Sequence, residues 1–234
     1  MKVAFFEFKK TLEQKKYLVI GLVVSFIVFN IFFLKESIYN PNYLYSIHDY
    51  QNSLGNNSPF VFLFLYLLKY DFNLIKIIRF KSEKHILMYH CIVAVCVSIT
   101  LSLIQVLCHM VIGYIYSIFI GGYFDAIIFS FISFTKLFLV LLSMCFIYFT
   151  MTTILKNSNF VVFLLIAFFM LCSYTYSILT KLIGLLSFNN HSPFLEEEII
   201  FSNHYTIYKM VGLILFVTIL MRIHKMLLSK IEYL

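Results

Sequence analysis

PFVFLFLYLLKYDFNLIKIIRFKSEKH, residues 59–85, joins a short apolar run to a strongly basic segment. The first ten of these residues are apolar, and the remaining seventeen contain five basic side chains, those of Lys69, Lys76, Arg79, Lys81 and Lys84. A helix needs about 20 apolar residues to cross roughly 30 Å of hydrocarbon, so ten are too few by themselves. Residues 59–68 cross a membrane only if their helix begins near residue 53, and that choice decides on which side the basic segment lies.

The composition of the whole chain excludes a water-soluble fold. Of the 234 residues, 62% are apolar and 12% are charged, and the mean hydropathy is +0.92. Soluble domains average about 45–50% apolar and about 25% charged residues. The longest polar interval between apolar runs is the 24 residues 35–58, so we expect a single domain, residues 1–234, without a separate soluble part. Besides residues 53–68, five runs predict transmembrane helices: residues 17–34, 86–106, 137–155, 160–179 and 205–221.

The distribution of basic residues favours six crossings. Cytoplasmic flanks of membrane-spanning helices are enriched in Lys and Arg. If the N-terminus is cytoplasmic and residues 53–68 cross, 14 of the 18 basic residues lie inside and four outside, namely Lys35, Lys136, Lys181 and Lys209. We therefore predict an all-α integral protein of the bacterial cytoplasmic membrane, with six transmembrane helices and both termini in the cytoplasm. The net charge of +7 then reflects topology and anionic lipid, and no nucleic-acid partner is expected.

Two further segments are amphipathic rather than spanning. In residues 1–16, Phe5, Phe8 and Leu12 form an apolar stripe among five lysines, which predicts a helix lying in the inner membrane interface. In residues 69–85, apolar side chains recur at positions 70, 74, 77 and 78, with basic side chains on the other faces. This second segment is either a surface helix that satisfies the charge rule or a contact surface that a soluble partner grips, and the residues alone favour neither.

The stretch from residue 109 to residue 135 stays apolar through the glycine pair Gly121 and Gly122. It predicts two long helices that project past the outer membrane surface and turn at this pair. The four outer lysines lie near the ends of apolar runs, where a long side chain can extend its ammonium group into the lipid headgroups. The alternative is that Lys136 or Lys181 faces an interior pathway.

Motifs for catalysis and nucleotide binding do not occur in this sequence. It contains no GxxxxGK[ST], HExxH or GxSxG, so we expect no enzymatic activity and no cofactor bound by this chain. The five cysteines lie in apolar runs without CxxC spacing, which indicates packing rather than a metal site. The scattered histidines are interpreted as interface or packing residues. The alternative is a proton relay, for which a buried His109, one turn from Gln105, is the candidate.

The order of these elements resembles the membrane subunit of a type-2 (ABC-2-like) ABC exporter over nearly the whole chain. The most local part of the resemblance is the segment from residue 70 to residue 86. Asp71 matches the acidic residue that begins the family's cytoplasmic coupling helix, residues 72–80 match that helix, and residues 81–84 match the turn after it. The family's proline in this turn and its Gly-Thr after the acidic residue are absent here.

The resemblance implies a permease that works with partners. Two membrane subunits, identical or related, would pair, and separate ATPase subunits would bind ATP and grip each coupling helix. The residues implied in that contact are Asp71, Leu74, Ile75, Lys76, Ile78, Arg79, Lys81 and Glu83. Export of amphipathic or antimicrobial peptides, or immunity to them, is the implied function.

Two other classes of protein are the alternatives. One is the substrate-binding membrane subunit of an energy-coupling-factor-type importer, which needs grooves of small residues for its partner. This chain has only four alanines, each isolated, Ala4, Ala94, Ala126 and Ala167. The other is an intramembrane enzyme, which the absence of a paired catalytic set disfavours.

Overall fold

The computed structural model describes residues 2–34, 50–68, 83–120, 126–186 and 203–230. All regular structure in these residues is helical, which confirms the all-α prediction. The helices are α1 (Lys2–Gln14), α2 (Lys16–Leu34), α4 (Tyr50–Leu68), α6 (Glu83–Ile120), α7 (Ala126–Leu155), α8 (Ser158–Leu186) and α10 (Asn203–Ser229). Each of the six apolar runs predicted from the sequence lies inside one of the helices α2 to α10.

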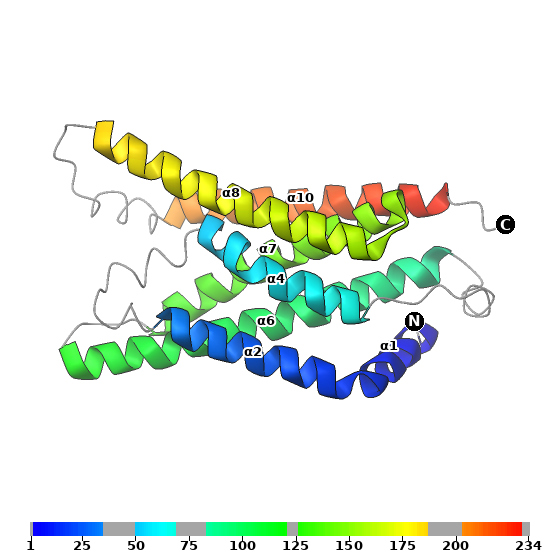
Figure 1. Ribbon diagram of the computed structural model, residues 1–234, viewed down its shortest axis with the longest axis horizontal. Helices are drawn as coiled ribbons and strands as arrows, with labels where there is room; N and C mark the ends of the chain where they lie inside the picture. The colour runs from blue at the N-terminus through cyan, green and yellow to red at the C-terminus, as the bar shows by residue number, and fades with distance from the viewer. Residues whose placement is uncertain (1, 35–49, 69–82, 121–125, 187–202, 231–234) are drawn as a thin grey trace.

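The helices α2 to α10 lie alongside one another and alternate in direction along the long axis of the molecule (Figure 1). Helices α2, α6 and α8 run one way, and α4, α7 and α10 run back. As a consequence, α1 and the end of α10 lie at the same end of the bundle (Figure 1). We call this the terminal end, defined by α1, the last residues of α4, α7 and α10, and the first residues of α2, α6 and α8.

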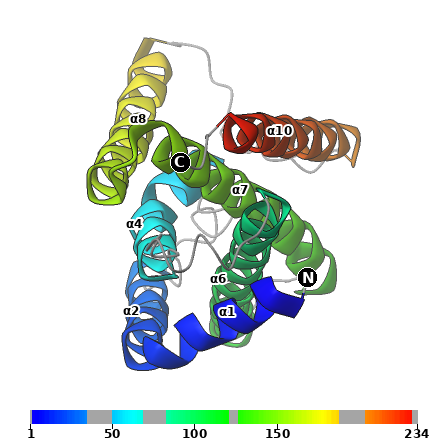
Figure 2. The same ribbon diagram turned by 90° about the vertical axis from the view of Figure 1, so that its right-hand side faces the viewer.

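Helix α7 is the centre of the bundle. It packs against α4, α6, α8 and α10 (Figure 2). Its side chains Leu141, Met144 and Cys145 are fully buried. Lipid tails are as apolar as these side chains, so close packing rather than escape from water holds such helices together.

Length and composition mark three helical segments as long and apolar enough to cross a membrane: Lys84–Val111, Ser133–Leu155 and Met210–Ser229. The pair formed by α1 and α2, bent by 77°, makes a fourth if it counts as one span. In α8, the part searched is a shorter apolar helix, Ser158–Cys172. Helix α4 contains Pro59, and its first turns are polar. Three to four candidate spans are therefore established, and the six crossings stay a prediction.

Helix α1 lies across the terminal end and packs against α6 and α4 (Figure 2). Its buried face consists of Ala4, Glu7 and Phe8, while Phe5 and Phe6 are 58% and 62% exposed. The stripe predicted from the sequence was therefore partly wrong. Phe8 faces the bundle and Leu12 packs on the core, but Phe5 points away from it. The reason is that α1 packs one face on the bundle and leaves the Phe5–Phe6 side exposed.

Two predicted boundaries are clarified. Helix α6 continues to Ile120 and α7 begins at Ala126, which confirms that both helices extend well beyond their apolar runs. The predicted turn at Gly121 and Gly122 lies outside the described residues. Helix α6 begins at Glu83, so residues 83–85 belong to this helix and not to the basic segment before it, which is a correction. A carboxylate in the first turn of a helix is favourable because the N-terminal end of the helix dipole is positive.

A short turn connects α7 to α8. Lys156 has a positive φ of 55°, and its backbone N–H donates to the carbonyl of Thr152 at 3.0 Å. The side-chain oxygen of Asn157 then accepts from the backbone N–H of Phe160 at 3.2 Å, which caps the start of α8. A left-handed residue that ends a helix is usually glycine, because a Cβ is strained there.

This turn generates a stability prediction. We expect Lys156→Gly to raise the free energy of unfolding by about 1 kcal/mol, because a left-handed conformation costs a residue with a Cβ about that much. Lys156→Val should lower it, since a branched Cβ fits the position less well. The melting temperature of the purified protein in detergent measures both variants. A valine variant at least as stable as the glycine variant would contradict the assigned conformation.

Candidate functional site

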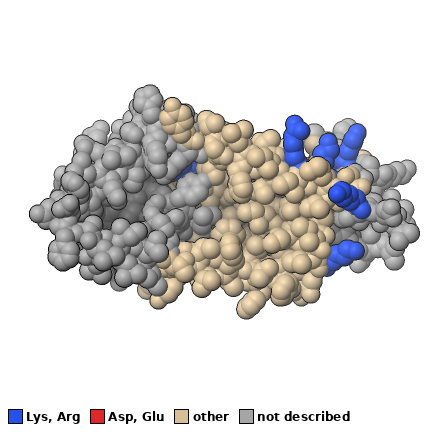
Figure 3. All heavy atoms as spheres, turned by 90° about the horizontal axis from the view of Figure 1, so that it is seen from above, with Lys and Arg blue, Asp and Glu red and all other residues tan. Residues whose placement is uncertain are grey.

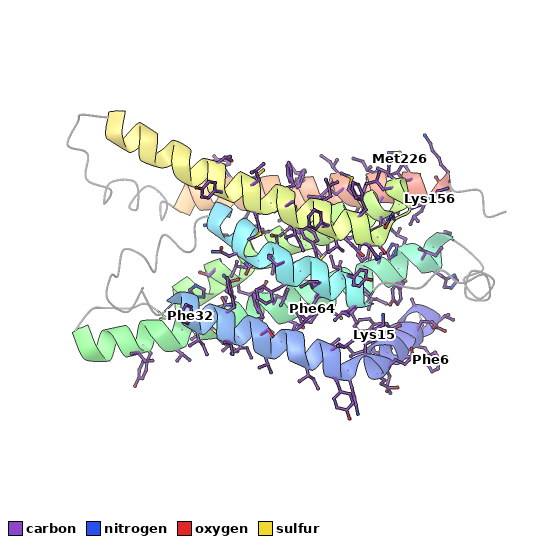
Figure 4. The ribbon with its side chains drawn as sticks, in the orientation of Figure 1. Phe6, Lys15, Phe32, Phe64, Lys156 and Met226 are labelled. Atoms are coloured by element: carbon purple, nitrogen blue, oxygen red, sulfur yellow. The ribbon has the colours of Figure 1, made fainter. Side chains whose placement is uncertain are left out.

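The terminal end carries most of the charge in the described part of the chain. Figure 3 shows Lys and Arg side chains of one face gathered there, and Figure 4 labels Lys15 and Lys156 at this end and Phe32 at the other. The basic residues at this end are Lys2, Lys9, Lys10, Lys15, Lys16, Lys84, Lys156, Arg222, Lys225 and Lys230. The exceptions on the described helices are Lys136 in the first half of α7, Lys181 near the end of α8 and Lys209 in the first half of α10. The Lys16 ammonium also lies over the Tyr17 ring, 5.0 Å from its centroid, a pairing suited to the headgroup region.

The basic segment leaves the bundle at this terminal end. Asp71, Leu74, Ile75, Lys76, Ile78, Arg79 and Lys81, which the sequence singled out, lie outside the described residues, and Glu83 is the first residue of α6. The structure therefore describes the two roots of the segment, Leu68 and Glu83, and not its surface.

Two hydrogen bonds fix the first root. The Lys15 Nζ donates to the carbonyl of Leu67 at 2.7 Å, and the hydroxyl of Tyr89 donates to the carbonyl of Leu68 at 2.8 Å. These carbonyls belong to the last turn of α4, where no helical N–H is available to them. A cation there also complements the negative end of the helix dipole. The corner between α1 and α2, the end of α4 and the first turns of α6 are thereby joined where residues 69–82 begin.

A second feature is a line of polar side chains along the buried face of α6. These side chains recur at helical spacing and are at most 5% exposed: His90, Ser98, Ser102, Gln105 and His109. From His90 to His109 the helix rises about 28 Å, close to the thickness of the hydrocarbon core. Together with Asn57, Cys145, Tyr148 and His224, which lie buried on neighbouring helices, we call them the polar seam.

The seam contacts α10 and α7 near the terminal end. His90 Nδ1 lies 2.9 Å from His224 Nε2, so one of the two nitrogens donates an N–H to the other. The His90 ring also stacks on Phe149 of α7, with centroids 4.2 Å apart and an interplanar angle of 10°. Ring stacking and an N–H···N bond hold three helices together at one level.

In the middle of the seam, α6 contacts α7 through a thiol, which forms weaker hydrogen bonds than an amide or imidazole. Ser98 Oγ lies 3.7 Å from Cys145 Sγ, and that sulfur lies 3.9 Å from the carbonyl of Ala94. Tyr148, one turn along α7 from Cys145, is buried with its ring 6.3 Å from that of Phe62. Because α7 runs antiparallel to α6, Tyr148 lies at a level between Ser98 and His90.

At its far end the seam reaches α4. The Asn57 side-chain N–H donates to Gln105 Oε1 at 2.9 Å, and His109 Nδ1 donates to the carbonyl of Gln105. Ser58 is also buried and its hydroxyl donates to the carbonyl of Gly55. Within the polar part of α4 that weakened its prediction as a span, Asn57 and Ser58 therefore face the protein interior.

Three polar atoms of the seam have no hydrogen-bond partner among the described residues. They are Ser102 Oγ, the Tyr148 hydroxyl and His224 Nδ1, each inaccessible to solvent. Within that same part of the chain no group of three His, Cys, Asp or Glu side chains is placed to hold a metal ion. The five cysteines carry free thiols. The seam is thus a neutral arrangement of hydroxyls, amides and imidazoles.

The sequence indicated only part of this site. It pointed to Gln105 and His109 and treated the other histidines singly, although the 98, 102, 105, 109 spacing on one helix face is a readable signal. The partners from α4, α7 and α10 were missed because they are remote in sequence.

Comparison with protein-family models, curated proteins and solved structures finds no match to this chain.

The bond between Asn57 and Gln105 generates a coupling prediction. Asn57→Ala and Gln105→Ala should each destabilise the protein, and the double variant should lose less than the two single losses combined. We expect a coupling energy of about 0.6 to 1.7 kcal/mol, the range for hydrogen bonds between membrane helices. Unfolding by SDS titration measures it.

Asn30 is the matched control in α2, because its side chain is buried and, within the described part of the chain, donates to the carbonyl of Phe26 in its own helix. The stability losses of Asn30→Ala and Gln105→Ala should be additive in the double variant. If the stability losses of Asn57→Ala and Gln105→Ala are additive as well, the bond contributes nothing to the packing of α4 on α6.

Proposed function

We propose that this chain is the membrane-spanning subunit of an ATP-driven exporter, which crosses the bilayer six times and is moved by a separate ATPase subunit through residues 69–82. The observation that carries the proposal is that the end of α4, where this segment begins, is hydrogen-bonded to the α1–α2 corner and to α6. A force applied there acts directly on Leu67 and Leu68, and through Lys15 and Tyr89 on the α1–α2 corner and on α6.

Helix directions support six crossings. Helices α6, α7 and α10 are long and apolar enough to span, and α2, α4 and α8 lie along the same axis beside them (Figure 1). A bilayer that accommodates the first three therefore also surrounds the other three. Helix α4, the weakest candidate by composition, is supported by the burial of Gly55, Asn57 and Ser58 within the bundle. Polar groups turned inward do not oppose insertion into lipid.

Charge supports the orientation. The terminal end holds α1, the root of residues 69–82 and most described basic side chains, and such an end faces the cytoplasm of a bacterial membrane. Exposed Phe5 and Phe6 on α1 suit the inner interface beside it. An ATPase is soluble and cytoplasmic, so the segment would lie on the side where it can be reached.

The partners and substrate follow from the resemblance of residues 70–86 to the coupling region of ABC-2-like exporters. A second membrane subunit, identical or related, would complete the transporter, and ATP would be bound by the ATPase subunits. Amphipathic or antimicrobial peptides are the proposed substrates. The lipid-facing sides of α2, α8 and α10 are rich in exposed large apolar side chains, which is compatible with peptides that enter from the membrane.

The proposal predicts that Lys76→Glu combined with Arg79→Glu abolishes co-purification of the ATPase subunit with the tagged chain from its own cells. Cells that carry this variant should become as sensitive to an amphipathic peptide as cells that lack the chain. The reason is that reversed charges oppose the surface that grips the segment. Lys225→Glu with Lys230→Glu, at the same end on and just after α10, is the matched control and should leave both properties unchanged.

Two results would contradict the proposal. One is an ATPase subunit that still binds the charge-reversed variant, in cells that keep wild-type resistance to the amphipathic peptide. The other is the absence of any ATPase subunit from the complex purified with the wild-type chain.

A further inference from the structure

The helices of the bundle form two groups. The most extensive contacts join α4 to α8, α6 to α7 and α7 to α10, so α4 and α8 make one group and α6, α7 and α10 make the other (Figure 2). The contacts of α4 with α6 and α7, and of α8 with α7, are less extensive. We call this surface, where α4 and α8 meet α6 and α7, the group boundary. It is the surface along which these helices separate with the least loss of packing.

Hydrogen bonds hold the two ends of the group boundary differently. At the terminal end, the last carbonyls of α4 accept from the Lys15 ammonium and from the Tyr89 hydroxyl of α6. Toward the far end, α4 is bonded to α6 by the amides of Asn57 and Gln105. Hydrogen bonds between neutral side chains of membrane helices are individually weak. Opening of the far end therefore costs less than opening of the terminal end, where one of the two bonds has a charged donor.

Two buried hydroxyl groups of α6 and α7 have no hydrogen-bond partner among the described residues. They belong to Ser102 and Tyr148. Elsewhere in α7, buried hydroxyls donate to carbonyls of their own helix, as those of Ser143 and Thr150 do. A buried polar atom without a partner costs free energy, because lipid offers it no replacement. A ligand that bonds to these two hydroxyls would recover that cost.

Both of these hydroxyl groups lie at the group boundary. The ring centroid of Tyr148 is 6.3 Å from that of Phe62 on α4, which in turn lies 5.6 Å from that of Phe169 on α8. Ser102 shares one face of α6 with Gln105, the next residue of the polar seam, whose side chain bonds to α4. The helices of both groups therefore meet around these side chains.

The composition of the group boundary fits an amphipathic peptide. Its hydroxyls and carboxamides each donate and accept hydrogen bonds and carry no charge. The other buried side chains of these helices are mostly apolar, Phe62, Leu65 and Leu141 among them. Polar side chains of a peptide that enters hydrocarbon need hydrogen-bond partners, while its apolar face packs on apolar residues. The boundary supplies a surface for each of the two faces that such a peptide presents.

We propose that a peptide substrate moves along the group boundary when α4 and α8 swing away from α6 and α7 at the far end, and that Ser102 and Tyr148 donate hydrogen bonds to it. This inference rests on the proposed export function and identifies where the chain holds its substrate. In the structure described here, the bond between Asn57 and Gln105 keeps the far end closed. The terminal end, joined to the segment that an ATPase would grip, serves as the pivot.

The opening is tested with Ser102→Cys in the complex of the full-length chain with its ATPase subunit, in vesicles of phosphatidylethanolamine and phosphatidylglycerol. A small methanethiosulfonate reagent should label this cysteine during ATP hydrolysis and leave it unlabelled without ATP. Mass spectrometry reads the labelling at each cysteine separately. Cys145, buried between α6 and α7 of one group, is the internal control and should stay unlabelled in both conditions.

Ser102→Ala and Tyr148→Phe test the contact with the substrate. Each removes a buried oxygen that bonds to no described residue, so the fold and the bound ATPase subunit should be retained, as size-exclusion chromatography would verify. In vesicles with the ATPase outside, ATP drives uptake of a fluorescent helical peptide of leucine and lysine. Each variant should raise the peptide concentration for half-maximal uptake about tenfold, as expected for one lost hydrogen bond. The matched controls, Ser25→Ala and Tyr208→Phe on exposed faces of α2 and α10, should transport like the wild type.

The results separate this inference from the export proposal. If the wild-type complex contains no ATPase, or takes up no peptide with ATP, the export proposal is wrong and the inference with it. If the wild type transports the peptide but both hydroxyl variants keep its half-maximal concentration, the pathway along the group boundary is wrong and export stands. The same conclusion follows if Ser102→Cys stays unlabelled during ATP hydrolysis.

Discussion

In hydrocarbon, a polar group that finds no partner inside the protein finds none at all, and this constraint governs the whole arrangement. It makes every described element a helix, because a helix satisfies its own backbone. It also accounts for the inward position of Asn57 and Ser58 on α4 and of the seam residues on α6. Asn57 and Gln105 bond to each other across the two helices, and His90 bonds to His224 across α6 and α10. These contacts set the register of helices whose apolar surfaces alone would pack in many ways.

At the terminal end, the last carbonyls of α4 have no partner within their own helix. Lys15 and Tyr89 supply donors from the α1–α2 corner and from α6. The exit of residues 69–82 is therefore attached to three elements rather than to one helix end. A force applied at such an attachment would act on all three elements, and this is the physical basis of the proposed coupling to an ATPase.

Much of the fold could be predicted from the sequence, because apolar length is a local signal. The runs 17–34 and 137–155 lie within α2 and α7, and the polar turns ahead of Pro59 were correctly expected to belong to a helix. What could not be predicted depends on contacts between distant residues. The inward face of α1 includes Ala4 and excludes Phe5 because of where α6 lies, and no pattern in residues 1–16 reveals that. Within the seam, His109 and Gln105 share one helix face and could be paired on sight, whereas His90 and His224 are separated by most of the chain.

The central claim is that α4 crosses the membrane and places residues 69–82 in the cytoplasm beside α1. Arg79→Cys tests it most directly, by labelling with a membrane-impermeant maleimide in intact and in permeabilised cells, relative to the parent chain. The account predicts labelling above the parent only after permeabilisation. Equal labelling of the variant in intact cells would place the segment outside, and both the six-helix topology and the proposed coupling would be wrong.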